Sequence, residues 1–210
     1  MAAIQYKPTR MELSNLKKRL KTAVRGHKMM KDKRDELVRR FIVLARKNKE
    51  LREQTEAKMA AATQNFVLAK ATMSNNEIEE ALLYPARGIQ VDAEKQHILS
   101  IPVPKLSMNT SEEIVYPYGF SSTSADLDGA VQAIAEALPL MLELAEVEKS
   151  TARLADEIEK TRRRVNALEY VMIPQYTEAI RTIQMKLDEN ERGNLSRLMK
   201  TKEMLQSQAQ

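Results

Sequence analysis

Apolar side chains recur in alternating steps of three and four residues along the first quarter of the chain. Counted in this way from Leu13 to Thr55, nine of thirteen positions are apolar. A heptad repeat that continues for about six heptads is typical of a helix that packs against a second helix. The pattern therefore predicts a long N-terminal helix with an apolar seam along one side.

A second seam of this kind runs from Met141 to Leu187. Pro139 is expected to kink or restart this helix and Pro174 to bend it, because proline cannot donate the helical hydrogen bond. The chain turns back between the two seams, so the two helices are expected to run antiparallel. The seam positions that we predict are Leu16, Leu20, Met30, Leu37, Phe41, Leu44, Leu51, Ile158, Val165, Leu168, Met172, Ile180, Ile183 and Leu187.

Local signals suggest where the two long helices begin and end. Thr9 followed by Glu12 forms a capping-box pattern, so the N-terminal helix is expected over residues 9–73. Ser124 precedes acidic residues that suit a first helical turn, which places the C-terminal helix at residues 124–204.

The middle block, residues 74–123, has a different pattern. After one short helix, apolar residues alternate with polar ones from Ile89, and this period of two predicts a β-hairpin over about residues 88–103. Pro102 suits the end of an edge strand. Residues 104–123 contain Pro, Gly and Ser and are expected to form a loop.

Together these elements predict a mainly α protein: a long antiparallel two-helix coiled coil with a short β-hairpin and loop block in the middle. If the chain turns midway between Met73 and Leu138, facing residues should have numbers that sum to about 205–215. Leu37 would then lie near Pro174.

Charge is distributed unevenly along the chain, whose formal net charge is +5. Residues 7–52 hold 17 basic and 5 acidic side chains, whereas the remainder holds 17 and 24. A basic helix of this kind suits a nucleic acid, an acidic protein partner, or simply a solvated surface.

The sequence offers little chemistry for a reaction. It has no Cys, and its two histidines, His27 and His97, are far apart. His27 is better explained as a polar seam position that fixes the register, together with Arg34 and Asn48. We therefore expect no catalytic, cofactor-binding or metal-binding residues and no cofactor. With no apolar run long enough to cross a bilayer and no signal-peptide pattern, a cytoplasmic location is expected.

Three classes of function remain open on these grounds. A nucleic-acid-binding coiled coil would use the basic helix, although no aromatic residues alternate with its charges, as base stacking would need. A generic coiled-coil scaffold would self-associate. An enzyme is the least expected class, because the sequence shows no constellation of catalytic residues.

Several long runs of the sequence are distinctive: residues 8–13 (PTRMEL), 25–28 (RGHK), 31–37 (KDKRDEL), 157–170 (EIEKTRRRVNALEY) and 187–192 (LDENER). These runs resemble the D-subunit family of prokaryotic V/A-type ATPases, whose members form the central rotor stalk. The resemblance covers nearly the whole chain and is weakest at about residues 75–125.

The resemblance implies a non-catalytic shaft that couples ATP hydrolysis or synthesis in a hexamer of A and B subunits to ion translocation through a membrane ring. Its implied partners are that hexamer, the small F subunit, and the funnel-shaped subunit that caps the ring. It implies no nucleic-acid partner and a location peripheral to the cell membrane, without insertion. Arg25, Lys28 and Arg163 are the residues that we expect to contact the hexamer.

Overall fold

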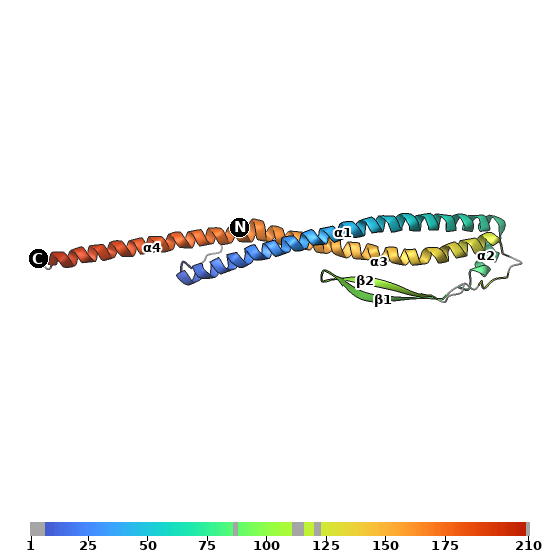
Figure 1. Cartoon of the computed structure of the whole chain (residues 1–210), viewed down its shortest axis with the longest axis horizontal. Coiled ribbons are helices and arrows are strands. Elements are labelled where there is room, and N and C mark those ends of the chain that lie inside the picture. The colour runs from blue at the N-terminus through green and yellow to red at the C-terminus, as the bar shows by residue number, and fades with distance from the viewer. Residues whose placement is uncertain (1–6, 86–87, 111–115, 120–122, 209–210) are drawn as a thin grey trace. The chain divides into compact units, whose positions relative to one another are not determined.

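The computed structural model describes residues 7–85, 88–110, 116–119 and 123–208 (Figure 1). Two long helical segments and a small antiparallel hairpin confirm the predicted fold class. Residues 111–115 and 120–122 of the expected loop lie outside these residues. In chain order the elements are α1 (Arg10–Thr72), α2 (Asn75–Ala81), β1 (Ile89–Ile98), β2 (Ile101–Thr110), α3 (Ala125–Ala167), η1 (Leu168–Met172) and α4 (Ile173–Gln208).

The chain divides into two compact units. Unit 1 combines the chain up to Asp35 with the chain from Glu159 onward, and unit 2 is Glu36–Ile158. Helix α1 is continuous through the boundary and contributes to both units. Each unit therefore pairs one part of α1 with one part of the C-terminal helical segment.

Unit 1 is held together by a narrow line of buried side chains and by two ion pairs between helices. The pairs are Arg10–Glu191 and His27–Glu169, and their order along the two segments shows that the segments run antiparallel. Buried side chains at the seam exclude water from a two-helix contact that has no thick interior. The buried residues are Leu16, Ala23, Thr161, Val165 and Ile183.

Unit 2 has two apolar clusters. In the first, Leu37 of α1 and Leu154 of α3 are fully buried together with Ile101 and Val103 of β2. The second cluster lies where α1 ends and α3 begins, and its buried members are Ala69, Ala81 and Leu127.

The register of the two long segments differs from the expected one. Ion-paired residues on facing segments have numbers that sum to between 190 and 201, for Arg10–Glu191, His27–Glu169, Lys47–Glu143 and Arg52–Glu148. The expected window of about 205–215 was wrong, and Leu37 packs with Leu154 instead of lying near Pro174.

The cause of this shift is at the start of α3. The Ser124 hydroxyl accepts a hydrogen bond from the Asp126 N–H at 3.3 Å, and the helix begins at once and continues through Pro139. Pro139 therefore does not restart the helix. Leu127 of α3 is already buried in one cluster with Ala69 of α1, well before Leu138.

Pro174 lies in the first turn of α4, directly after the wide turn η1. In η1 the Ile173 N–H donates to the Leu168 carbonyl, which is the i→i−5 bond of a π-turn. A π-turn changes the hydrogen-bond ladder next to a proline, whose ring would clash in a regular helix interior. The helical segment thus continues past Pro174.

The hairpin is longer than the sequence predicted. Its two-residue turn, Leu99–Ser100, has φ values of 50° and 69°, as in the type I′ turn that suits a twisted hairpin. Strand β2 continues to Thr110, so residues 104–110 are strand and not loop. The expected boundary at 103 was wrong because Pro102 and Pro104 suggested the end of the strand, whereas both lie within β2.

Candidate partner-binding surface

The most distinctive surface of unit 1 is a run of cations on α1. No acidic residue occurs between Glu12 and Asp32, while seven lysines and arginines do. All seven are exposed, and none forms an ion pair within the described part of the chain. These residues are Lys17, Lys18, Arg19, Lys21, Arg25, Lys28 and Lys31.

One end of this run lines an open groove of about 400 Å³. Its lining residues recur at helical spacing along the first three turns of α1, so their side chains share one face. Exposed ammonium groups without paired carboxylates attract anionic groups, and salt screens that attraction. The lining residues are Arg10, Leu13, Ser14, Lys17, Lys18 and Lys21, of which Arg10 is paired with Glu191.

The three residues expected to contact a hexamer do not share one environment. Arg25 and Lys28 are exposed members of the unpaired run. Arg163 is exposed on α3 and is paired with Glu159 one turn earlier on the same helix. Its charge is therefore partly neutralised locally, whereas those of Arg25 and Lys28 are not.

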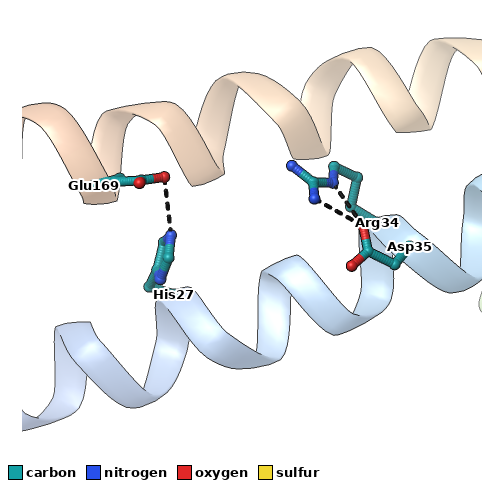
Figure 2. A network of polar contacts seen from close by, with 4 residues as sticks. All are labelled: His27, Arg34, Asp35 and Glu169. Atoms are coloured by element: carbon teal, nitrogen blue, oxygen red, sulfur yellow. Dashed lines mark hydrogen bonds and ion pairs between the residues drawn. The ribbon is translucent and has the colours of Figure 1, made fainter.

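Figure 2 shows the polar contacts that lie beside the seam of unit 1. The His27 Nε2 lies 3.3 Å from a carboxylate oxygen of Glu169, which η1 carries. Arg34 instead forms two hydrogen bonds with Asp35 on its own helix, at 3.0 and 2.7 Å. His27 thus makes a polar contact between helices, whereas the described bonds of Arg34 stay within α1.

The expected seam residues differ in how far they are buried. Leu16, Leu37, Leu51, Val165 and Ile183 are buried. The remaining expected positions are half-buried except Met172, which is 38% exposed next to Pro174.

The described residues contain no group of three or more His, Cys, Asp or Glu side chains able to hold a metal ion. None of the helices within those same residues is long and apolar enough to cross a membrane.

The two units carry net charges of opposite sign. Counted over the whole sequence, unit 1 holds 21 basic and 10 acidic residues, a net of +11, and unit 2 holds 13 and 19, a net of −6. In unit 2 two cations of α1 meet glutamates of α3: Lys47–Glu143 at 2.6 Å and Arg52–Glu148 at 3.2 Å. The surplus positive charge therefore belongs to unit 1.

The chain also matches a known family along most of its length. The model of the ATP synthase D-subunit family matches residues 12–203, which include nearly all of the described helices and the hairpin. The chain belongs to the ATP synthase D-subunit family. This confirms the resemblance found in the sequence.

Bacterial members of the D-subunit family are similar to this chain from end to end. The V-type ATP synthase D subunit of Acetivibrio thermocellus is 58% identical, covering 100% of this chain and 96% of its own length. Proteins with the same name from Clostridium novyi and a Thermoanaerobacter species are 54% and 52% identical, and each comparison covers at least 98% of both chains.

Sequence reasoning missed how the hairpin is held in this member of the D-subunit family. The Leu106 N–H of β2 donates to a carboxylate oxygen of Glu146 on α3 at 2.9 Å. Ile101 and Val103 are buried against the long helices. Their alternation in the sequence indicated one buried face, but residues 104–110 were predicted to be loop, so the contact of Leu106 with α3 was not expected.

Proposed function

We propose that this chain is the central rotor shaft of a V-type ATP synthase. In this proposal it couples ATP hydrolysis or synthesis in a hexamer of A and B subunits to ion translocation through a membrane ring. It carries no catalytic residue itself. It binds the small F subunit and the funnel-shaped subunit of the ring, and it is peripheral to the membrane without inserting into it.

Membership of the D-subunit family over residues 12–203 is the observation that carries this proposal. The relatives are named as subunits of V-type ATP synthases, and their similarity covers the whole chain. Paired helices also suit a part that transmits torque, because two packed helices resist bending better than one.

The unpaired cations of unit 1 suggest how the shaft contacts its surroundings. A shaft that turns inside a ring meets the same ring surface at many angles, so deep apolar interlocking would hold it at one of them. Charge–charge attraction weakens gradually with distance and is screened by salt. Cations such as Arg25 and Lys28 can therefore attract an acidic ring interior without fixing one angle.

Charge reversal on α1 tests this proposal. Arg25→Glu with Lys28→Glu should weaken binding to an A/B hexamer by roughly tenfold at low salt and by less at high salt. The matched control is Arg46→Glu with Lys58→Glu, two exposed cations of the same helix in unit 2 that form no ion pair within the described residues. The control should bind the hexamer as the wild type does.

Two outcomes would contradict the rotor proposal. One is wild-type chain that shows no binding to the hexamer at any salt concentration. The other is tight binding to duplex DNA with a steep salt dependence, which would indicate that the cations contact phosphates.

A further inference from the structure

The two outer edges of the hairpin are not equivalent. Ile98 pairs with Ile101 across the two-residue turn, and the ladder pairs each further residue down to Ile89 and Thr110. In a hairpin of this type the residues that flank the turn form a hydrogen-bonded pair, and such pairs then alternate with non-bonded ones. Even-numbered residues of β1 therefore bond to odd-numbered residues of β2.

The outer edge of β2 is closed to another strand from Pro102 to Leu106. Its even-numbered residues direct their backbone groups away from β1, and two of them, Pro102 and Pro104, have no N–H to donate. The third, Leu106, already donates its N–H to Glu146 of α3. Prolines and covering elements are the means by which proteins protect sheet edges.

The outer edge of β1 has neither protection. Its odd-numbered residues direct N–H and C=O groups away from β2, and none of them is proline. These positions are exposed, and no described residue of the chain bonds to their backbone groups from outside the hairpin. They are Ile89, Val91, Ala93, Lys95 and His97.

We propose that the outer edge of β1 binds an extended strand of another protein chain, which adds a third strand to the hairpin. Main-chain hydrogen bonds to the odd-numbered residues supply the affinity in this type of recognition, and side chains supply the specificity. A two-stranded hairpin is marginally stable by itself, and a third strand stabilises it.

The charges of β1 determine which strand it binds. Asp92 and Glu94 lie two residues apart on one face of β1. Asp92 accepts a hydrogen bond from the Asn109 side chain at 3.0 Å, and Glu94 lies opposite Lys105 in the ladder without an ion pair within the described part of the chain. The opposite face carries the apolar side chains of Ile89, Val91 and Ala93. The strand that fits presents Lys or Arg to the acidic face and apolar residues to the other.

A second copy of the chain does not fit this edge. An antiparallel pairing of two β1 strands centred on Ala93 places Asp92 opposite Glu94 twice, and a pairing centred on Lys95 places two lysines opposite each other. Like charges directly opposite each other destabilise a strand pair. The acidic residues thus act against self-association while they favour a basic strand.

Residue-resolved hydrogen exchange tests this edge. Exchange is compared between the full-length chain alone and the assembly that a tagged chain forms in its own cell. The amides of Val91, Ala93 and Lys95 should exchange about tenfold or more slowly in the assembly. The amides of Asp92 and Glu94, already bonded to β2, should change less.

Two matched proline variants separate the two edges. Val91 and Met108 face each other across the ladder, and each directs its N–H to an opposite outer edge. Val91→Pro should abolish the protection of Ala93 and Lys95, whereas Met108→Pro should leave it intact, because only the first removes a donor from the open edge. Val91→Ala, which keeps the N–H, should behave as wild type.

Three results would overturn the strand proposal. One is exchange at odd-numbered β1 amides that is the same in the assembly and in the free chain. Another is equal protection of odd and even amides with equal loss in both proline variants. That result would mean that a partner stabilises the whole hairpin without adding a strand to it. The third is protection in the concentrated free chain, which would indicate self-pairing. None of these results bears on hexamer binding, so the rotor proposal is judged separately.

Discussion

At the scale of single residues, the contact between the helices of unit 1 depends on a few side chains. Val165 is 1% exposed and is one of only five buried residues in that unit among those described. Thr161, one turn earlier, is equally buried, and its hydroxyl has no hydrogen-bond partner among the described residues. Because this seam is narrow, no neighbouring layer of side chains can compensate for a defect in it.

Val165→Glu should therefore destabilise the chain by about 3 kcal/mol or more, because it leaves a charge buried without a partner. Thermal unfolding followed by helical circular dichroism should show a lower melting temperature and a less cooperative transition. Asn166→Glu, at the exposed neighbouring position, is the control and should melt close to the wild type. If both variants melt alike, Val165 does not lie in the seam.

Tyr118 should make the stability of unit 2 depend on pH in the alkaline range. Burial, together with a 2.7 Å hydrogen bond from its hydroxyl to Asp128, raises the pKa of the Tyr118 phenol well above its ordinary value near 10. Only the neutral phenol can donate that bond. Its contribution to stability is therefore complete below about pH 10 and is lost as the pH rises further.

The melting temperature of the wild type should consequently fall more steeply above about pH 10 than that of Tyr118→Phe, which has no such bond to lose. Tyr116→Phe is the control, because the Tyr116 ring packs against Tyr118 without the bond to Asp128. Equal pH profiles for the wild type and Tyr118→Phe would contradict this account.

At the scale of elements, the hairpin belongs to the core of unit 2. Alternation in the sequence predicted the hairpin but not which residues it packs against. Ile101 and Val103 are buried with Leu37 and Leu154. A pair of strands that is marginal by itself is stabilised by contact with the long helices.

Ile101→Ala should accordingly cost about 2 kcal/mol or more in the free energy of unfolding, because it leaves a cavity beside Leu37. Denaturant melts of the full chain measure this cost. Val91→Ala removes an exposed side chain from the other strand and should cost little. Similar values for the two variants would show that the hairpin tip is not part of the core.

Replacing residues 88–110 with a short Gly/Ser linker should preserve most of the helicity, because α1 and α3 still face each other. It should lower the melting temperature, since Leu37 and Leu154 lose their cover. A collapse of helicity, measured by circular dichroism, would show instead that the helices cannot pair without the hairpin.

At the scale of the whole molecule, the two units carry net charges of opposite sign, and the run of cations from Lys17 to Lys31, unpaired within the described residues, belongs to unit 1. A protein with this distribution can meet an acidic partner with one unit and a basic partner with the other. The proposed acidic hexamer interior and the proposed basic strand at β1 follow this division.

The purified chain alone should not hydrolyse ATP, because in the proposed function the reaction belongs to the A and B subunits. The assay is phosphate release by repurified chain. Hydrolysis that survives repurification and disappears on a point substitution in this chain would overturn the proposed function.

The sequence by itself determined the long helices, their antiparallel order, the presence of a hairpin and the family. Heptad spacing and alternation are periodic signals that a short window of sequence contains. The clustering of cations between Glu12 and Asp32 was equally visible, since charge needs no tertiary information.

Only the tertiary structure decided the register, the length of β2 and the difference between the two hairpin edges. The register depends on where α3 starts and on its passage through Pro139, and a proline pattern is compatible with a kink, a restart or a continuous helix. The closed edge of β2 depends on Glu146 meeting Leu106, residues 40 positions apart. Contacts between distant residues leave no periodic trace, so the chain must be folded before they can be seen.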